Sequence, residues 1–338
     1  MSIDGIVTQI EYKIAKVPLK SPYRLSYGTF NDYEIIQTEL SIDGGIKLIG
    51  EVTPLSGYTE ETLESIIKTI ENLKGRIINK TVMQVISTLD GLITSENSFA
   101  ISTLLPPLEI FQEKIDGPVN ISRSLLLYAL EYIHKDTEKL DVEIAGIYEA
   151  GYKTIKIKLG KNFRQEMKLL NQLKECNLHN LRIRFDANGG YNTKQTSEVL
   201  TYLSENLSEH TDYLEQPLNK TDWLNIKKLC KIGFITPIML DESFYNFDDI
   251  KRANDAGVRY IKIKLCKFGS LKKLKEVVDY AADNGMNIIL GNGVATDIAN
   301  YYEICFYNKN QSKIYGAIES VGFLKLVNPL KFNIGVIQ

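Results

Sequence analysis

Apolar and polar positions in the first third of the chain follow a strand pattern and then a helical one. From Val7 to about Pro54 they alternate in extended segments, with an Asp43-Gly44-Gly45 turn between two of them, which is typical of an antiparallel β-meander. Helical spacing follows over residues 59–74, 81–94 and 99–114, the last of these interrupted by a Pro-Pro pair. A meander followed by helices predicts an α+β domain over residues 1–115.

The pattern changes after residue 116, where short apolar strands alternate with amphipathic helices. The expected strands are VNISRSLLL, YKTIKIKL, LRIRFDAN, DYLEQPL, ITPIMLDES, RYIKIKL, MNIILGN and KIYGAIE. Parallel strands joined by helices in this number favour a (β/α) TIM-type barrel over residues 116–321 rather than an open sheet. Residues 322–338 are expected to return to the first domain, so the predicted fold class is α/β, a barrel with an α+β capping domain.

Composition narrows the classes of partner. The 338 residues are 44% hydrophobic and 24% charged, which is ordinary for a globular protein. The 40 basic and 42 acidic residues leave a net charge of -2, so no field attracts nucleic acid or an anionic membrane. The first residues alternate like a strand and lack the pattern of a signal peptide. We expect a cytoplasmic protein with neither nucleic acid nor membrane as a partner; a homo-oligomer stays an open alternative.

Cysteine and histidine offer little catalytic chemistry. The cysteines lack CxxC spacing, so neither a zinc site nor a disulfide framework is indicated, and each is expected to be a small buried hydrophobe; they are Cys176, Cys230, Cys266 and Cys305. The histidines His134, His179 and His210 leave little room for a Ser/His/Asp triad or a histidine metal cluster. Acid–base chemistry therefore falls to other residues.

Lysines occupy inward positions on two predicted strands. Side chains of a parallel barrel alternate between the interior and the surrounding helices, and catalytic groups sit at the carboxyl ends of strands. In YKTIKIKLG the apolar set suits the helices, which places Lys156 and Lys158 on the inward face. The same rule applied to RYIKIKLCK places Lys262 and Lys264 inward. Two strands thus deliver lysines towards one place.

The strands between these two end in carboxylates. Asp186, Glu215 and Asp241 close three successive strands, and Asn188 and Glu242 follow closely. A single charge at a strand end is most often a solvated rim residue, but that interpretation does not account for charges at five strand ends together. Three convergent carboxylates repel one another without a cation, and oxygen ligands select a hard ion such as Mg²⁺ over zinc. The sequence therefore predicts a divalent metal.

The order of these motifs resembles the muconate-lactonizing subgroup of the enolase superfamily. The matching segments are Lys156-Ile157-Lys158, Asp186-Ala187-Asn188, Glu215-Gln216-Pro217, Asp241-Glu242 and Ile263-Lys264-Leu265. The resemblance covers essentially the whole chain, because SPYRLSYGTF and GEVTPLSGYTEET look like the two capping loops that close over substrate in that family. It implies that Asp186, Glu215 and Asp241 bind Mg²⁺, with Mn²⁺ as the alternative ion, and that Asn188 and Glu242 support them.

The resemblance also implies roles for the lysines and the substrate contacts. Lys158 and Lys264 would be acid/base groups on opposite faces of a small carboxylate substrate, with Lys156 beside them. The metal would stabilise the enediolate formed when the carbon next to the carboxylate loses its proton. We expect Lys156 to lower the pKa of Lys158. Substrate contacts are expected from Tyr23, Arg24, Ser26, Asn292 and Glu319.

Several reactions fit this site. No histidine follows His210, which disfavours the mandelate-racemase type. The second capping loop and Gly269-Ser270-Leu271 resemble o-succinylbenzoate synthases, although Gly291-Asn292-Gly293 replaces their serine-rich turn. An o-succinylbenzoate synthase or cycloisomerase, a lyase or isomerase, therefore ranks first. An epimerase or racemase of dipeptides or N-acyl amino acids ranks second, because dipeptide epimerases of the lysine type carry Asp-x-Asp near the eighth strand, where this chain has at most Glu319. A non-catalytic ligand-binding barrel is the third alternative.

Overall fold

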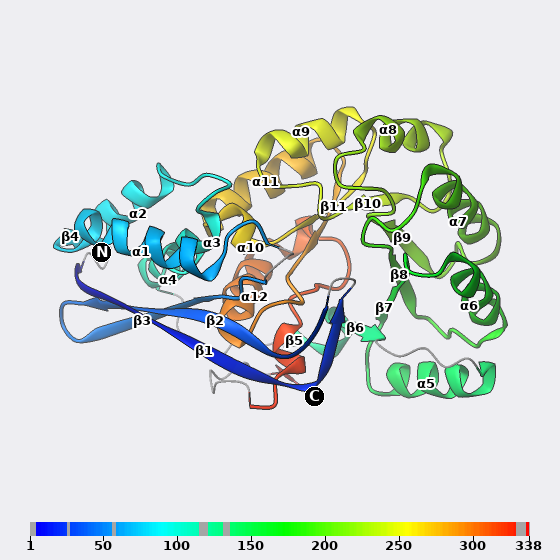
Figure 1. The fold of residues 1–338 in the computed structure, drawn as a ribbon, viewed down its shortest axis with the longest axis horizontal. Coiled ribbons are helices and arrows are strands. Elements are labelled where there is room, and N and C mark those ends of the chain that lie inside the picture. The colour runs from blue at the N-terminus through cyan, green and yellow to red at the C-terminus, as the bar shows by residue number, and fades with distance from the viewer. Residues whose placement is uncertain are drawn as a thin grey trace.

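The computed structural model describes residues 5–25, 28–55, 59–114, 121–130, 136–328 and 336–337. Its first part is an antiparallel sheet in the order β3-β2-β1-β4 (Figure 1). The strands are β1 (Ile6–Leu25), β2 (Gly28–Ile42), β3 (Ile46–Val52) and β4 (Lys80–Thr81). The predicted Asp43-Gly44-Gly45 turn joins β2 to β3, with Gly44 and Gly45 at φ of 80° and 83°, values that favour glycine.

Helices cover one face of this sheet. They are α1 (Leu63–Ile77), α2 (Val82–Asp90), α3 (Ser98–Ser102) and α4 (Leu105–Gln112). Thr62 and Thr81 begin α1 and α2 with capping boxes, which satisfy the first free backbone N–H groups. The Pro-Pro pair lies in the first turn of α4, where proline needs no hydrogen-bond partner. Ile66, Ile70 and other apolar side chains of these helices share one core with β1 and β2.

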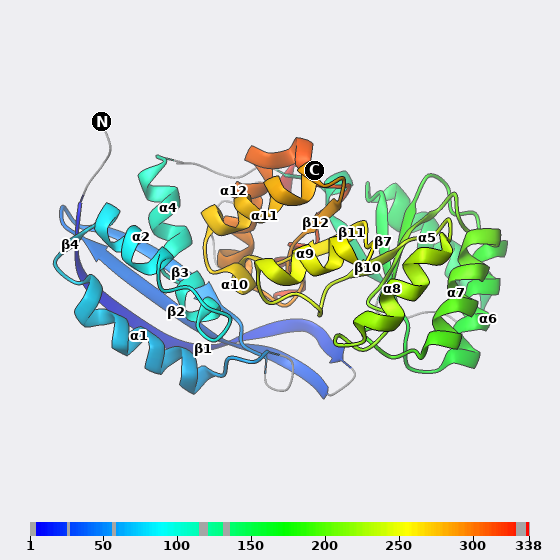
Figure 2. The same cartoon turned by 90° about the horizontal axis from the view of Figure 1, so that it is seen from above.

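The second part is a parallel sheet of neighbours in chain order, wrapped into a barrel with helices outside (Figure 2). Its strands are β6 (Leu127–Leu130), β7 (Thr154–Lys158), β8 (Arg182–Asp186), β9 (Thr211–Glu215), β10 (Ile238–Leu240), β11 (Tyr260–Ile263) and β12 (Asn287–Leu290). The helices are α5 (Thr137–Glu149), α6 (Phe163–Glu175), α7 (Thr193–Asn206), α8 (Trp223–Ile232), α9 (Phe247–Asp255), α10 (Leu265–Phe268), α11 (Leu271–Asp283) and α12 (Asp297–Asn310).

The first and last predicted barrel strands differ from the expectation. The segment VNISRSLLL was expected to be a strand, but Ser122 caps a 3₁₀ turn over Arg123–Leu125 and the barrel strand begins only at Leu127. KIYGAIE forms no regular strand. Its residues still close the barrel, since Tyr315 N and Glu319 N donate to Ile288 O and Leu290 O, and Ile318 forms a parallel bridge with Leu126. This irregular segment therefore closes the barrel at the position where an eighth strand was predicted.

The segment after the barrel crosses to the first sheet. A 3₁₀ turn covers Gly322–Lys325, after which Leu326 bridges Leu19 and Val327 N donates to Pro18 O at 3.1 Å. Lys20 adds a hydrogen bond from its Nζ to Leu324 O at 2.9 Å. By contrast, β13 (Val336–Ile337) pairs with β5 (Ile121–Ser122) beside the barrel. Residues 324–327 are thereby fixed between the cap and the barrel.

The cysteines form no disulfide bonds. All four cysteines are free thiols; Cys266 and Cys305 are buried, while Cys176 and Cys230 are half-buried. Within the described part of the chain, no helix has the length and apolar character needed to cross a membrane.

Candidate active site

Strand alternation turns four lysines into the barrel. Ile155, Ile157 and Leu159 belong to the apolar core, so Lys156 and Lys158, one residue out of phase, point the other way. Ile261, Ile263 and Leu265 direct Lys262 and Lys264 inward in the same manner. Lys156, Lys262 and Lys264 are buried, whereas Lys158, at the end of β7, is partly exposed.

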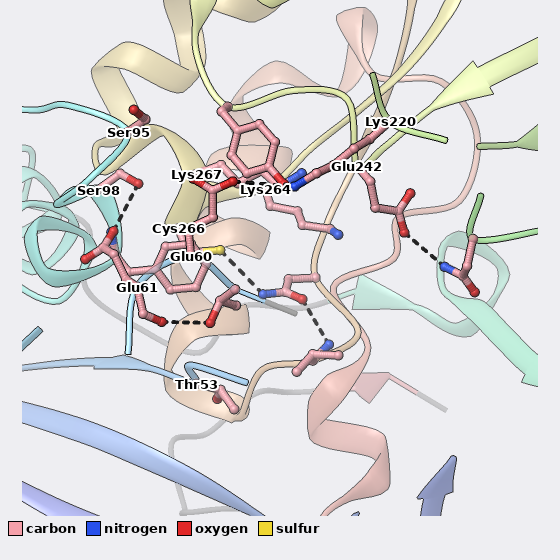
Figure 3. Close-up of a pocket in the computed structure, with 16 residues that line it drawn as sticks. Thr53, Glu60, Glu61, Ser95, Ser98, Lys220, Glu242, Lys264, Cys266 and Lys267 are labelled. Atoms are coloured by element: carbon pink, nitrogen blue, oxygen red, sulfur yellow. Dashed lines mark hydrogen bonds and ion pairs between the residues drawn. The ribbon is translucent and has the colours of Figure 1, made fainter. Parts of the chain in front are cut away.

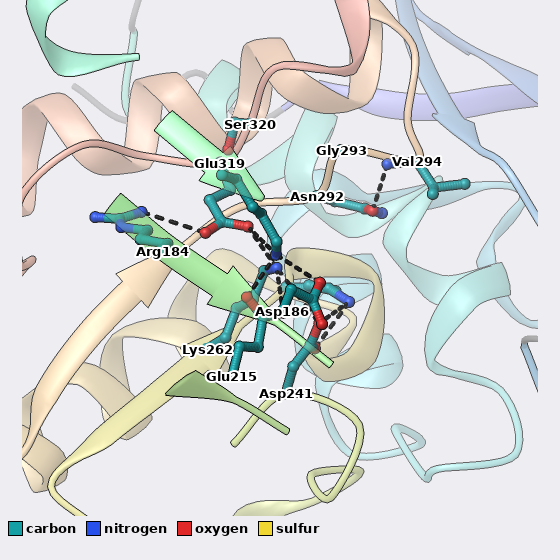
Figure 4. Close-up of polar contacts among 12 residues, drawn as sticks. Arg184, Asp186, Glu215, Asp241, Lys262, Asn292, Gly293, Val294, Glu319 and Ser320 are labelled. Atoms are coloured by element: carbon teal, nitrogen blue, oxygen red, sulfur yellow. Dashed lines mark hydrogen bonds and ion pairs between the residues drawn. The ribbon is translucent and has the colours of Figure 1, made fainter. Parts of the chain in front are cut away.

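Three carboxylates meet these lysines at neighbouring strand ends (Figure 4). Asp186 ends β8, Glu215 ends β9 and Asp241 follows β10, and none is more than 2% exposed. Lys156 Nζ lies 2.9 Å from Asp186 Oδ2 and 2.5 Å from Glu215 Oε2. Lys262 Nζ lies 3.0 Å from Glu215 Oε1 and 3.4 Å from Asp241 Oδ2. Each ammonium group therefore bridges two neighbouring carboxylates.

Asp186, Glu215 and Asp241 form a carboxylate row, and the other two lysines lie at its two ends. Lys158 Nζ is 2.6 Å from Asp186 Oδ2 and donates to Asn188 Oδ1 at 2.9 Å. Lys264 Nζ is 2.8 Å from the Asp241 carboxylate. Because the two strands β7 and β11 flank β8, β9 and β10 in the sheet, Lys158 and Lys264 bracket the three carboxylates from opposite sides.

Asn188 and Glu242 connect the outer parts of the site. Asn188 has a φ of 43°, a region that asparagine tolerates better than most residues. This turn lets Asn188 Nδ2 donate to Glu242 Oε1 at 3.0 Å while its Oδ1 accepts from Lys158. The second Glu242 oxygen, Oε2, is buried and has no hydrogen-bond partner in the described residues. Burial, Asp241 and Asp186 together raise the pKa of Glu242.

Glu319, from the segment that closes the barrel, is already saturated with protein contacts. Its Oε2 accepts from Lys156 at 3.0 Å and lies 2.5 Å from Lys262 Nζ. Its Oε1 accepts from Arg184 at 3.3 Å and from the Tyr213 hydroxyl at 3.2 Å. Glu319 was predicted to contact substrate; the structure places it at the cavity wall, with both oxygens turned to cations of the barrel.

The buried charges around Arg184, next to the carboxylate row, were not predicted from the sequence. Arg184 is fully buried and pairs with Asp212 Oδ2 at 3.1 Å as well as with Glu319. Arg184 and Tyr213 precede Asp186 and Glu215 by two positions, so the alternation that identified the carboxylates also assigns these two to the interior. The signal was present in the sequence, but no partner for Arg184 could be named without the fold.

The pKa values of the lysines depend on the carboxylates as well as on the neighbouring lysines. Burial lowers the pKa of Lys158 and so does Lys156, as predicted, but the Asp186 carboxylate raises it and leaves it above the usual value. The pKa of Lys264 is also raised above its usual value, because burial lowers it but contact with the Asp241 carboxylate raises it to a net increase. Glu215, in the middle of the row, has a pKa raised to about 8 by burial and by Asp186. Contact with a carboxylate at 2.6 Å thus outweighs repulsion between the neighbouring lysines.

The oxygen atoms available at this site suit a hard dication as ligands. In the described ranges no three acidic, histidine or cysteine side chains close into a ready-made metal cluster; Lys156 and Lys262 supply the positive charge between the carboxylates. The available donors are nonetheless all oxygens, from the buried Asp186, Glu215 and Asp241 and from the unpartnered Glu242 Oε2. Oxygen donors of this kind bind Mg²⁺ in preference to softer metals.

Two cavities meet at Lys264. The larger, of about 570 Å³, lies over the lysines and carboxylates and is roofed by Ser21, Pro22 and Tyr23. The smaller, of about 240 Å³, extends from Lys264 towards the cap and is lined by Thr53, Glu61, Lys220, Tyr245 and Lys267, among others (Figure 3). Both include Asn188, Lys264, Asn292 and Val294.

The residues predicted to touch substrate divide into two groups. Tyr23 and Asn292 line the large cavity. Gly291, at a φ of 134° and with Ser320 N only 2.1 Å from where a Cβ would lie, admits no side chain, and this close approach sets the position of Asn292. Ser26 and residues 56–58 of the second capping loop lie outside the described residues, as does the side chain of Arg24.

This arrangement of strand-end lysines and carboxylates over a capped parallel barrel defines an enolase-type fold and site. The family model for enolase C-terminal domain-like proteins matches residues 139–315, more than half of the chain. The chain therefore belongs to this family, and with it to the enolase superfamily of enzymes.

Relatives of the chain fall among isomerases and lyases. It is 26% identical over 294 residues to an L-Ala-D/L-Glu epimerase of Francisella tularensis subsp. novicida, covering 84% of this chain and 82% of the relative. It is 23% identical over 317 residues to an o-succinylbenzoate synthase of Listeria innocua, covering 90% and 83%. The chain is thus similar to enzymes of both reaction types.

Solved structures share the fold over nearly the whole chain. A muconate lactonizing enzyme from Pseudomonas fluorescens matches with a TM-score of 0.81 and 20% identity, covering 96% of this chain and 90% of that one. A dipeptide epimerase from Cytophaga hutchinsonii, complexed with Mg and a dipeptide, matches with a TM-score of 0.80 and 19% identity, covering 96% and 89%. The predicted barrel with an α+β cap is confirmed, as is the resemblance to the muconate-lactonizing subgroup.

Proposed function

We propose that the protein is a Mg²⁺-dependent epimerase or racemase that removes and returns the α-proton of an amino-acid derivative whose α-nitrogen is acylated. The observation that carries this proposal is the position of Lys158 and Lys264 at opposite ends of the carboxylate row, 2.6 Å and 2.8 Å from Asp186 and Asp241. Two amines on opposite sides of one site allow one to take a proton and the other to deliver it to the opposite face.

Asp186, Glu215 and Asp241 would hold the metal, which supplies positive charge to stabilise a carboxylate that has lost its α-proton. Lys158 would accept the α-proton at Nζ only after releasing its own proton, because Asp186 holds its pKa above the usual value. The 2.9 Å hydrogen bond from its Nζ to Asn188 Oδ1 fixes the direction of that nitrogen. Lys264 returns a proton from its own Nζ on the other face. Lys156 keeps its charge in the buried row and stabilises negative charge on the substrate carboxylate.

The acylated nitrogen follows from the carboxylates that the described residues place at the large cavity, all of which already have protein partners. Among the described residues, four carboxylates line it: Glu166, Asp186, Asp241 and Glu319. The last three are paired with lysines, and Glu166 accepts from Lys161 N, Asn162 N and the Tyr191 hydroxyl. A substrate ammonium would face lysines without an acidic partner, which is costly in a buried site. An amide nitrogen avoids that cost.

A second candidate is dehydration of the o-succinylbenzoate synthase type. The similarity to the Listeria innocua enzyme favours it, as does the Gly269-Ser270-Leu271 segment that follows Lys264. In this reaction one lysine removes the α-proton and then protonates the departing hydroxyl, while the other only stabilises charge. The same residues thus serve both reactions, and the difference lies in whether both lysines exchange protons.

Proton NMR in D₂O with Mg²⁺ tests the proposal. We expect the α-proton signal of N-acyl amino acids to decrease while that of the matching free amino acids persists. Formation of an alkene product from a hydroxylated substrate would support the dehydratase instead. If the metal-loaded protein exchanged no α-proton from any of these carboxylates, a non-catalytic ligand-binding barrel would replace both.

A further inference from the structure

We infer that Lys262 is a built-in counter-ion of the metal site, which weakens Mg²⁺ binding and so sets the Mg²⁺ concentration at which the enzyme becomes active. This inference rests on the Mg²⁺-dependent reaction proposed above. That reaction gives tasks to Lys156, Lys158 and Lys264 but none to Lys262, although Lys262 contacts the same carboxylates.

The ammonium group of Lys262 contacts three carboxylates (Figure 4). Its Nζ lies 2.5 Å from Glu319 Oε2, 3.0 Å from Glu215 Oε1 and 3.4 Å from Asp241 Oδ2. A lysine ammonium has three N–H donors and no acceptor, so these three carboxylates account for its hydrogen-bonding capacity. Lys262 also lines the large cavity, but its donors are directed at the protein and not at a substrate.

Two of these carboxylates, Glu215 and Asp241, are also proposed ligands of the metal. An ammonium group that shares carboxylates with a dication repels it, and it withdraws negative charge from the shared oxygens. Lys262 is only 4% exposed, so water does little to screen this repulsion. Loss of the Lys262 charge should therefore tighten Mg²⁺ binding, whereas loss of a residue that only held the ligands in place would weaken it.

Glu319 keeps Lys262 at this position. The second oxygen of Glu319, Oε1, accepts from Arg184 at 3.3 Å and from the Tyr213 hydroxyl at 3.2 Å, so the carboxylate that holds Lys262 is itself fixed. Departure of the ammonium group on metal binding would leave Glu319 with less compensation in a buried site, which is costly. Lys262 and the metal would therefore share Glu215 and Asp241.

Lys262 is a better probe of this effect than Lys156. Lys156 also contacts two members of the carboxylate row, Asp186 and Glu215, but it is proposed to stabilise the substrate carboxylate as well. A change at Lys156 would alter substrate binding and metal binding together. A change at Lys262 reports on the metal alone.

Calorimetry with Mg²⁺ on the full-length protein, without substrate, tests the inference. The variants are Lys262→Met and Lys262→Arg, and Lys262→Met is also made in a Glu319→Leu background, where no Glu319 charge is left unpaired. The control is Lys220→Met. Lys220 lines the small cavity beside Lys264 but pairs with Glu60 and Tyr245. Thermal unfolding checks that each variant folds.

We expect Lys262→Met to bind Mg²⁺ at least roughly tenfold more tightly than the wild type, because repulsion between a dication and a buried ammonium on shared ligands exceeds the interaction that a tenfold change represents. Lys262→Met/Glu319→Leu should bind more tightly than Glu319→Leu by a similar factor. Lys262→Arg keeps the charge and should bind no more tightly than the wild type, and Lys220→Met should bind as wild type. The Mg²⁺ concentration that half-saturates α-proton exchange of N-acetyl-L-phenylalanine should fall in Lys262→Met.

Unchanged or weaker Mg²⁺ binding in Lys262→Met would overturn the inference, as would equal tightening in Lys262→Arg. If Lys262→Met does not fold, the comparison in the Glu319→Leu background decides in the same way. If Mg²⁺ binding tightens as expected but no α-proton exchanges, the proposed reaction fails and the role of Lys262 stands. If Mg²⁺ binds to neither the wild type nor any variant, the proposed metal and this inference fail together.

Discussion

Lys262 Nζ and Glu319 Oε2 lie 2.5 Å apart inside the barrel, where neither residue is more than 5% exposed. Lys262 continues this pair to Glu215 and Asp241, and Glu319 continues it to Arg184 and Lys156. The carboxylates Asp186, Glu215 and Asp241 are therefore connected to Glu319 and Arg184 by a network of buried ion pairs.

Breaking this pair should destabilise the protein. Lys262→Met removes one partner and leaves Glu319 with less compensation, and loss of one partner of a buried ion pair costs about 3–5 kcal/mol. Urea unfolding of the metal-free protein measures the cost. The double variant Lys262→Met/Glu319→Leu should recover part of it, because no unpaired charge then remains at this point. Additive losses in the double variant would show that the two side chains act independently.

Ionisation of Glu51 should lower the free energy of unfolding as the pH rises. It is buried on β3 near Asp297, the first residue of α12, and its Oε1 and both Asp297 carboxylate oxygens have no partner in the described chain. Burial and Asp297 raise the pKa of Glu51 to about 8, and burial raises that of Asp297 to about 6. A carboxyl with a raised folded pKa is neutral in both states below its unfolded pKa, and its ionisation above that value costs stability until the folded pKa is passed.

Glu51→Gln should therefore remove a decline in stability between about pH 5 and pH 8. We expect little difference from wild type near pH 5 and a gain of about 1–3 kcal/mol near pH 9, measured by urea unfolding. Glu71→Gln, on the solvent side of α1, is the matched control. A decline of the same slope in Glu51→Gln would assign the pH dependence to other groups.

Metal binding should depend on the charge of Asp241. Asp241→Asn retains the shape of the side chain and removes its charge, so Mg²⁺ affinity in calorimetry should fall at least roughly tenfold, the loss that corresponds to about 1.4 kcal/mol. Glu60→Gln, at the exposed edge of the small cavity, serves as control and should bind as wild type. Unchanged affinity in Asp241→Asn would exclude this carboxylate as a ligand.

The sequence predicted those parts of the site that depend on local periodicity. Lys156 and Lys158 could be assigned to the interior because their neighbours Ile155 and Ile157 are apolar and a strand alternates. The ends of β8, β9 and β10 could be brought together because a parallel barrel places all carboxyl ends at one mouth. Both arguments need only the pattern of a few consecutive residues.

Relations between distant segments could not be predicted. The partners of Glu319 lie on β7, β8, β9 and β11, and no spacing in the sequence encodes which of them it meets. The effect of Lys156 on the pKa of Lys158 was predicted, but the larger opposing effect of Asp186 was not, because it depends on the 2.6 Å distance between side chains of two different strands. The residues through which the segment after the barrel contacts the cap could not be named, because the contact is an isolated bridge between Leu326 and Leu19 that has no local pattern.

Lys158 and Lys264 are proposed to transfer protons on opposite faces of one substrate, and exchange of each separate enantiomer in D₂O measures the two transfers one at a time. Lys158→Ala and Lys264→Ala are each incubated with the separate L and D forms of an N-acyl amino acid and Mg²⁺, and α-proton loss is followed by NMR. We expect racemisation to be lost in both variants, while each variant still exchanges the α-proton of one enantiomer, and the two variants act on different enantiomers. Exchange of both enantiomers at the wild-type rate in both variants would contradict it.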